Sequence, residues 1–293
     1  MSSDRYRTTQ GGFDVVFSYA ILGVRAAPGP LLTAVLGELG YQESAARNQV
    51  IRLVNRGLVN ARKAGRYTVY TLGEVIAGRL HAISASGRAA PWSGSYRTLV
   101  YDIPETERTV RDRVRYIAGH FGYGTLRPGL MIAAGPQASP VQAVGPMPPG
   151  TLLEEGTLTP DDHASALRMA ERSWALSTLN ADYDRVARLI EDTLSTGLPD
   201  GAPGVRGWRD LYVQIAGTRL ADPSLPAELL PPRWAGERAV HLQAEFDGRH
   251  GPGVRSALWD RAVDPAWAHL VQINPDAYPP HPPDQSGVTG RSG

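Results

Sequence analysis

Side chains of the types that contact DNA bases and phosphates recur about one helical turn apart between residues 43 and 56. At about 100° per residue, Ala46, Val50 and Leu53 fall on one side of a helix over this range, where they can pack against a neighbouring helix. The opposite side is polar. Arginine can donate paired hydrogen bonds to guanine, asparagine can pair with adenine, and serine reaches phosphate or a base edge. The candidate DNA-contacting residues of this helix are Ser44, Arg47, Asn48, Arg52 and Arg56.

A basic β-hairpin is predicted directly after this helix. Residues 58–62 and 67–72 read as strands, and the turn between them carries Lys63-Ala64-Gly65-Arg66. Glu43 is the single acid among six basic residues between 43 and 70, whereas the whole chain carries a net charge of only +1, so positive charge is concentrated here. Helix, hairpin and basic tip in this order predict a winged helix-turn-helix, with Arg62, Lys63 and Arg66 on the wing. The alternative is a solvated amphipathic helix followed by an ordinary hairpin.

Two apolar helices are expected before the polar one, because residues 13–24 are strongly apolar and residues 31–39 resume an apolar pattern after Pro28-Gly29-Pro30. Residues 1–11 are predicted to form a mobile arm, and residues 74–82 a further helix with His81 at its surface. The predicted DNA-binding domain spans residues 1–84.

A Ser/Gly/Ala/Pro-rich linker at residues 85–95 marks the first predicted domain boundary. Strand 96–103, a helix from Glu105 to about Phe121 and strand 128–132 then form half of a ferredoxin-like sandwich. The second half is short and rich in proline, with residues 139–144 as its helix and 151–158 as its last strand. The middle domain is therefore placed at residues 96–158.

The remainder of the chain is predicted to be a helical domain, residues 159–274, followed by a disordered tail at 275–293. Helices are expected over 205–220 and 235–248, with aromatic residues at helical spacing. Such residues belong more often to a core than to a ligand site. As candidates for contact with a small-molecule effector we consider Trp174, Tyr183, Trp208, Arg209 and Tyr212.

Composition favours an α+β, multidomain protein. The chain has 293 residues, 42% of them hydrophobic and 20% charged, which is enough for two or three compact domains. It contains no cysteine, so it has neither disulfides nor thiolate metal ligands, and its seven histidines are scattered. We find no GxSxG, HExxH or phosphate-cradling glycine loop and therefore predict no catalytic residue, metal site or cofactor. In the absence of a signal peptide or long apolar run, we expect a cytoplasmic protein.

Three stretches of the chain resemble one family. The segments are ESAARNQVIRLVNRGLV, then APWSGSYRTLVYDIPETERTVRDRVRYI with GYGTLRPGLMI, and finally LADPSLPAELLPPRWAGERA. Together, over about residues 13 to 250, they resemble the PaaX family of bacterial transcriptional repressors. The resemblance implies a winged helix-turn-helix, a middle domain similar to the Cas2 nuclease fold and a helical C-terminal domain. It also implies a homodimer that leaves double-stranded operator DNA on binding an acyl-CoA, phenylacetyl-CoA in the best-known case, although no motif carries that ligand over to this chain.

Two other functions stay open at this point. Cas2-type nucleases place an aspartate at the end of the first strand, where Asp102 stands, and a pair of such residues across a dimer can hold a divalent metal. Asp102 has an ordinary alternative role as a turn residue before Pro104. The chain also fits a DNA-binding regulator that is controlled by a protein partner and has no effector.

Overall fold

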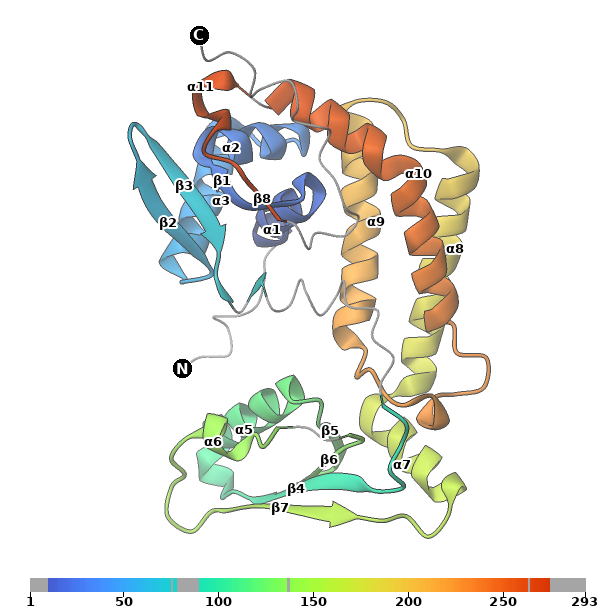
Figure 1. Cartoon of the computed structure of the whole chain (residues 1–293). Helices are drawn as coiled ribbons and strands as arrows, with labels where there is room; N and C mark the ends of the chain where they lie inside the picture. Colours follow the sequence, from blue (N-terminus) through green and yellow to red (C-terminus); the bar gives the residue numbers. More distant parts are fainter. Residues whose placement is uncertain (1–9, 75, 78–89, 136–137, 263, 275–293) are drawn as a thin grey trace. The chain divides into compact units, whose positions relative to one another are not determined.

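The computed structural model describes residues 10–74, 76–77, 90–135, 138–262 and 264–274. Most of the predicted helix at 74–82, including His81, most of the predicted arm, part of the linker and the tail at 275–293 lie outside the described residues. The fold is mixed α+β with two antiparallel four-stranded sheets. The chain divides into two compact units, which are described separately (Figure 1). Within the described residues, the first unit draws on 10–77, 186–217 and 238–274, and the second on 90–185 and 218–237.

Helices and a small sheet from the N-terminal part of the chain form most of the first unit. Its elements are α1 (Gln10–Leu22), β1 (Val24–Pro28), α2 (Gly29–Glu38), α3 (Glu43–Asn55), β2 (Val59–Ala64), β3 (Tyr67–Leu72) and, from the other end of the chain, β8 (Gln272–Ile273). The sheet order is β2-β3-β1-β8. Sequence reasoning missed β1, because five residues between the turn at Gly23 and the start of α2 carry no strand pattern of their own. Pairing with β3, such as Ala26 opposite Thr71, is what holds them extended.

The polar helix forms nearly where it was expected. Helix α3 begins at Glu43 with Gln42 as its N-cap. An acid in the first turn and Arg52 in the last turn both suit the helix dipole. Ala46, Val50 and Leu53 are buried in the core of the first unit, as their spacing predicted. The outward side of α3 is therefore fixed by what its inward side buries.

The second unit contains a complete ferredoxin-like arrangement. Its elements are β4 (Tyr96–Asp102), the short 3-10 helix η2 (Glu105–Glu107), α5 (Arg108–His120), β5 (Gly124–Arg127), β6 (Leu130–Ala133), α6 (Val141–Val144), β7 (Leu152–Leu158) and α7 (His163–Trp174). The sheet order β5-β6-β4-β7, all antiparallel, is that of a β-α-β-β-α-β sandwich. The second half exists in short form, as the sequence indicated. Residues 124–127, which lie outside the predicted strands, form a strand that pairs with β6 through a tight turn at Gly129.

Helices cover the two faces of this sheet. On one face, Val114 and Ala118 of α5 join Leu99 and Tyr101 of β4 in one apolar cluster, and Figure 1 shows α5 and α6 on the same side of the sheet. On the other face, Ala166 and Ala170 of α7 pack in a cluster with Tyr96 and Ile132. The Tyr96 hydroxyl donates a hydrogen bond to the Ala166 carbonyl oxygen over 2.8 Å. A buried polar atom is thus satisfied where helix and sheet meet.

Three long helices follow the middle domain, and the boundary between the two units falls within each of them. They are α8 (Leu176–Thr196), α9 (Ala202–Ala221) and α10 (Gly236–Ala262); shorter elements are η3 (Ala227–Leu229) and α11 (Pro265–Ala268). Trp208 of α9 and Phe246 of α10 lie in one apolar cluster with Leu31 of α2 and Leu53 of α3. The predicted domain boundaries stay a prediction. The packing adds that the core under α3 is completed by residues that stand some 150 to 200 positions further along the chain.

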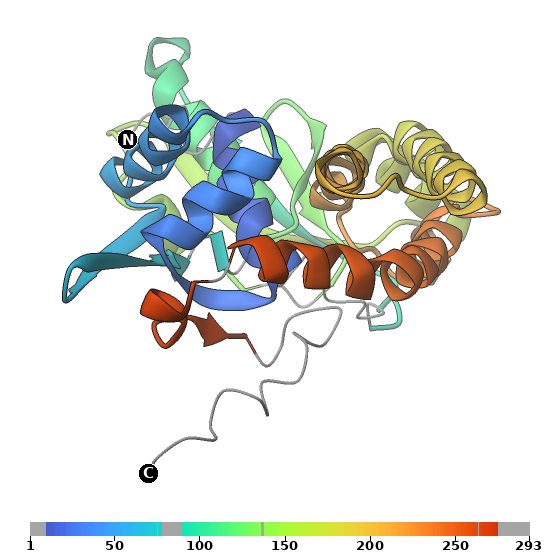
Figure 2. The same cartoon turned by 90° about the horizontal axis from the view of Figure 1, so that it is seen from above.

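Helix α10 extends well beyond residue 248, where we expected it to end. The run Gly251-Pro252-Gly253 is typical of a helix terminus, yet the helix continues through it. Pro252 has no N–H to donate to the carbonyl of residue 248, and such a proline bends a helix rather than ending it when the flanking turns are packed. Figures 1 and 2 show that α10 changes direction along its length.

Across the described residues, no helix combines the length and the apolar character that crossing a membrane requires.

Substitution of Gly124 tests the packing of β5 against α7. A Cβ atom there would lie 2.6 Å from the Trp174 ring and 2.8 Å from the Ser173 carbonyl oxygen, so Gly124→Ala should lower the free energy of unfolding by about 1–3 kcal/mol. Gly119→Ala on α5 is the matched control, since nothing lies within 4 Å of its added Cβ atom and alanine favours a helix. Urea denaturation measures both. Equal stability of the two variants would contradict this packing.

Candidate nucleic-acid interface

Helix α3 presents an exposed polar face. Ser44, Arg47, Asn48 and Arg52 are all exposed on the side opposite the buried Ala46, Val50 and Leu53. The guanidinium of Arg47 forms an ion pair with Glu43 one turn earlier. Arg56, the C-cap residue, is only partly exposed. Four of the five predicted residues of this helix are thus available together for contact with a ligand as large as DNA.

Ile51 stands in the middle of the same face and was missed by the sequence reasoning. Its side chain is 48% exposed, which is unusual for a large apolar residue on a folded helix. At about 100° per residue it falls between Arg47 and Asn48, so the helical period could have revealed it. An apolar side chain on a base-reading face can contact the methyl group of thymine.

The basic hairpin forms next to α3. Strands β2 and β3 pair in register from Val59 opposite Leu72 to Ala64 opposite Tyr67, and Gly65 adopts a left-handed φ of 59° in the turn. Arg62, Lys63 and Arg66 are all exposed. The Arg66 guanidinium carbon lies 4.9 Å from the centroid of the Tyr67 ring, a cation–π contact that holds the side chain at the tip. The hairpin presents three positive charges close to one another in sequence and structure.

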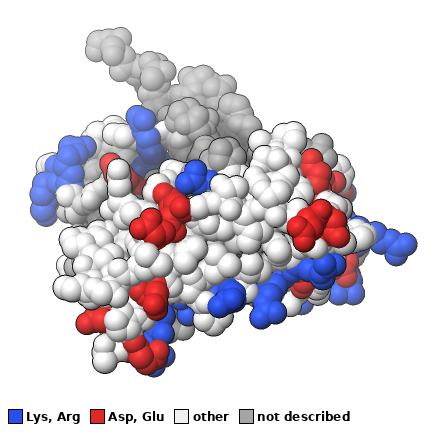
Figure 3. All heavy atoms as spheres, turned by 90° about the horizontal axis from the view of Figure 1, so that it is seen from below, with Lys and Arg blue, Asp and Glu red and all other residues white. Residues whose placement is uncertain are grey.

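This basic grouping contrasts with the rest of the charge distribution. On the face drawn in Figure 3, basic and acidic side chains are interspersed in small groups between wide uncharged areas. The net charge of +1 reflects that balance. A run of basic residues with one acid at its start is therefore a local feature of α3 and its hairpin.

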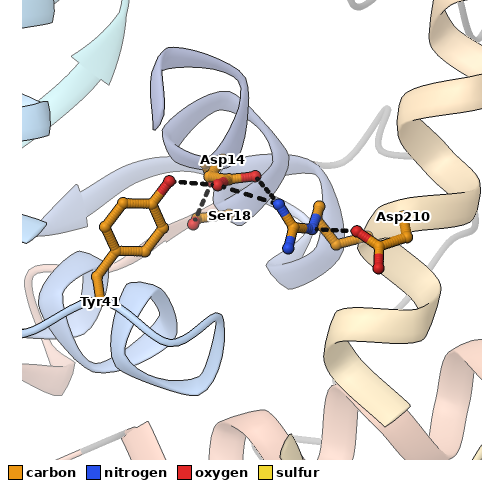
Figure 4. Close-up of polar contacts among 5 residues, drawn as sticks. Asp14, Ser18, Tyr41 and Asp210 are labelled. Atoms are coloured by element: carbon orange, nitrogen blue, oxygen red, sulfur yellow. Dashed lines mark hydrogen bonds and ion pairs between the residues drawn. The ribbon is translucent and has the colours of Figure 1, made fainter. Parts of the chain in front are cut away.

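A buried carboxylate fixes the start of α3. Asp14 of α1 has no exposed surface, and the Tyr41 hydroxyl, in the turn before α3, donates a hydrogen bond of 2.6 Å to its Oδ2 atom (Figure 4). Arg209 of α9 donates from Nη1 to both Asp14 oxygens at 3.3 and 3.4 Å, and its Nε lies 2.9 Å from Asp210. Burial and the adjacent carboxylate raise the pKa of Tyr41 to about 12. Helices α1 and α9 and the residue two positions before α3 thus meet at one charge.

The five predicted effector residues fall into two groups. Trp174 and Tyr183 belong to the second unit, and Trp208, Arg209 and Tyr212 to the first. Each makes a contact inside its own unit: the Tyr183 hydroxyl donates to Asp222 over 2.6 Å, Trp208 is buried in the core, and Arg209 binds Asp14. Within one unit, the structure brings together only the last three.

Tyr212 leads to a second buried carboxylate. Its hydroxyl donates a hydrogen bond of 3.0 Å to Oδ2 of Asp247 on α10, a residue with no exposed surface. Burial raises the pKa of Asp247 to about 7, although hydrogen bonds from Tyr212 and Gln243 and the charge of Arg255 act in the opposite direction. Burial also raises the pKa of Tyr212. Sequence reasoning missed Asp247 because a single aspartate on a helix gives no signal of burial.

Comparison with known proteins finds similarity to one family. Residues 89–145 match the model of the PaaX protein central Cas2-like domain, and residues 205–254 match that of the PaaX-like protein C-terminal domain. The chain is also 25% identical, over 244 residues, to the protein named transcriptional repressor PaaX of Escherichia coli strain K12, covering 76% of this chain and 74% of that protein. These matches show that the chain is similar to the PaaX family over its middle and C-terminal parts.

A solved structure agrees with this fold. The uncharacterized protein Rv0674 of Mycobacterium tuberculosis matches 78% of this chain and 89% of its own, with a TM-score of 0.53 and 20% sequence identity. At that identity the likeness concerns the fold alone. The match to the central-domain model and the strand order agree that the middle of the chain is Cas2-like.

Asp102, the residue on which a nuclease function would depend, ends β4 of this Cas2-like domain. It is exposed and stands opposite Leu152 of β7 in the sheet. Within the described ranges, no three His, Asp or Glu residues lie close enough together to hold a metal ion.

Removal of the cation at the Asp14 cluster is expected to destabilise the first unit. Arg209→Met leaves the fully buried Asp14 charge with a tyrosine hydroxyl as its remaining side-chain partner, and breaking a buried pair in this way costs about 3–5 kcal/mol. Arg238→Met, which breaks the half-exposed pair with Glu191, should cost less than about 1 kcal/mol. Chemical denaturation compares the two variants. Similar losses in both would show that Asp14 does not depend on Arg209.

Substitution of Asp247 should change how stability depends on pH. Burial raises the folded-state pKa of Asp247 from 3.8 to about 7, so ionising this carboxylate costs more free energy in the folded state than in the unfolded state. The free energy of unfolding of the wild type therefore falls as pH rises from about 4 to about 7. Asp247→Asn cannot ionise at this position. The free energy of unfolding of the variant minus that of the wild type should therefore increase between about pH 4 and pH 7 and stay constant above pH 7. Urea denaturation across this range measures the difference. Asp260→Asn, at an exposed position of the same helix, is the control.

Proposed function

We propose that this protein is a transcriptional regulator that binds double-stranded DNA in a sequence-specific way through a winged helix-turn-helix made of α1, α2, α3 and the β2–β3 hairpin. The observation that carries the proposal is the outward face of α3, where Ser44, Arg47, Asn48 and Arg52 are exposed together beside a basic hairpin. The relative named as a transcriptional repressor supports the same function.

Each side chain has a role that follows from its chemistry. Arg47, Asn48 and Arg52 read base edges in the major groove, and Ile51 contacts thymine methyl groups. Ser44 and Arg56 bind phosphate. Arg62, Lys63 and Arg66 bind the DNA backbone or the minor groove beside it. Before it contacts guanine, Arg47 must exchange Glu43 for the base, which is inexpensive because the pair is exposed.

The proposed assembly is a homodimer. Two copies of α3 related by a two-fold axis would enter successive major grooves of a pseudo-palindromic site, with half-sites about 10 base pairs or a multiple apart. The DNA-bound form acts as a repressor, and an effector of the acyl-CoA type releases it. Release requires that the effector bind the DNA-free conformation more tightly, since equal affinity for both states shifts nothing. Control by a protein partner instead of an effector is the alternative.

The first experiment titrates the purified protein against DNA from its own promoter region. Binding at two salt concentrations separates the phosphate contribution from base recognition. A panel of acyl-CoA esters then tests release. Sequence-specific binding that one ester abolishes would support the whole proposal, and the absence of binding above the non-specific level would overturn the regulator function.

Substitutions in α3 and substitutions in the hairpin should change DNA binding in different ways. Asn48→Ala or Arg52→Ala should weaken operator binding by about 1–3 kcal/mol and relax specificity at one position, because each removes a base contact. Arg66→Ala should weaken binding to all sequences and reduce the salt slope by about one, because it removes a phosphate contact. Fluorescence anisotropy with operator and scrambled DNA measures both effects.

Arg238→Ala is the matched control for these variants, since Arg238 is a half-exposed arginine on α10 paired with Glu191. Its DNA affinity should equal that of the wild type. If substitution of Arg47, Asn48 and Arg52 each left operator affinity unchanged, α3 would not be the reading helix.

A further inference from the structure

A buried arginine on α10 lacks a partner. Arg255 is 3% exposed, its Nε atom has no hydrogen-bond partner, and within the described part of the chain no carboxylate lies within ion-pair distance of its guanidinium. Burial lowers the pKa of Arg255. A buried charge that is neither paired nor hydrogen-bonded is costly, so proteins keep such groups where an anion can reach them.

Asp247 stands on the same side of α10, two turns before Arg255, and does not neutralise it. Its Oδ2 atom accepts the hydrogen bond from Tyr212, while Oδ1 has no partner in the described residues. The two charges attract one another across the intervening turn without direct contact. Gly251 occupies that turn. The cluster therefore contains an unpaired donor, an unpaired acceptor and a residue without a side chain between them.

Aromatic rings surround this turn of α10. A Cβ atom added at Gly251 would lie 2.9 Å from Nη2 of Arg255 and 3.0 Å from Cη2 of Trp208, so the guanidinium extends back toward the glycine and the indole. The Trp208 ring lies 5.3 Å from that of Phe246 and 6.1 Å from that of Tyr212, measured between centroids. The next residue, Pro252, has no N–H and interrupts the hydrogen bonds of the helix here.

We propose that Arg255 binds the carboxylate of a small organic acid, whose apolar or aromatic body packs against Trp208, Tyr212 and Phe246. A guanidinium donates two parallel hydrogen bonds to a carboxylate, and the rings supply apolar surface for the rest of the ligand. A single negative charge fits better than the double charge of phosphate, because Asp247 already contributes a carboxylate to the cluster. The binding site itself does not depend on the DNA-binding function. Its role as an effector site rests on that proposed function, with a free organic acid in place of the acyl-CoA-type effector.

The position of the site connects ligand binding to the contacts that hold α3 in place. Trp208 directly precedes Arg209 in α9, and Arg209 forms the ion pair with Asp14, which also accepts the Tyr41 hydrogen bond before α3. A ligand that displaces Trp208 therefore acts on the helix that carries this ion pair. Trp208, Phe246 and Leu53 of α3 also share one apolar core.

Calorimetric titration of the full chain tests the site directly, with acetate, benzoate, octanoate and inorganic phosphate as probes. We expect saturable binding of benzoate or octanoate, weaker binding of acetate, and none of phosphate. Binding should be tighter at about pH 6 than at about pH 8, because an incoming anion favours the protonated form of Asp247. His250, whose ring lies 5.1 Å from that of Phe246, also faces this cluster, but burial lowers its pKa, so its protonation changes less over this range. No saturable binding of any carboxylate, or equal binding of phosphate, overturns the proposal.

Variants separate a ligand site from a structural ion pair. Arg255→Met should lower carboxylate affinity by about tenfold or more, and Arg255→Lys by less, because lysine keeps the charge but loses the two-pronged geometry. Replacing an unpaired buried charge with an apolar side chain should leave the unfolding midpoint unchanged or raise it. Arg249→Met, at an exposed arginine on the same helix, is the control for affinity. A large loss of stability in Arg255→Met with unchanged carboxylate binding would assign Arg255 a structural role only.

Two further variants complete the test. Gly251→Ala places a methyl group against the guanidinium and should weaken binding without removing any charge. Asp247→Asn should bind carboxylates with an affinity that no longer changes between the two pH values. If carboxylate binding follows this pattern but the protein binds no promoter DNA, the site stands and the proposed regulator function falls.

Discussion

The charge of Asp14 is the constraint around which the first unit is organised. A carboxylate with no exposed surface on an otherwise apolar helix must be compensated from elsewhere, and both compensating groups come from other elements: Tyr41 before α3 and Arg209 of α9. Neither partner can be satisfied unless α1, α3 and α9 are in register with one another. The polar face of α3 is therefore directed outward by a buried interaction as well as by its own amphipathic pattern.

Local patterns predicted the parts of the fold that depend on local sequence. The period of Ala46, Val50 and Leu53 located α3 and its exposed face, and alternating residues around Gly65 located the hairpin. Both signals are strong because one side of each element is buried. The ferredoxin-like character of the middle domain was also predicted, in spite of an α6 of only four residues, although strand β5 was missed.

Elements that depend on distant partners were missed or misjudged. Strand β1 is extended because β3 and β8 pair with it, and α10 continues past Pro252 because its second half packs in the core. The candidate effector residues show the same limit. Periodicity identified Trp208 and Tyr212 as inward residues, but it could not place Arg209 on Asp14 or show that Asp247 and Arg255 are buried beside them. Tertiary packing decides whether a single charged residue on a helix is buried. The pattern of one sequence does not predict it.

Strand β8 has a consequence for how this protein is made. Its two residues, 272 and 273, hydrogen-bond to β1 and cover an edge of the sheet whose other strands are complete by residue 72. During synthesis, this edge of the N-terminal sheet stays unpaired until residues 272 and 273 have left the ribosome. Exposed strand edges are where chains pair wrongly with one another. The nascent protein is thus most vulnerable to aggregation during the long interval between its first strand and its last.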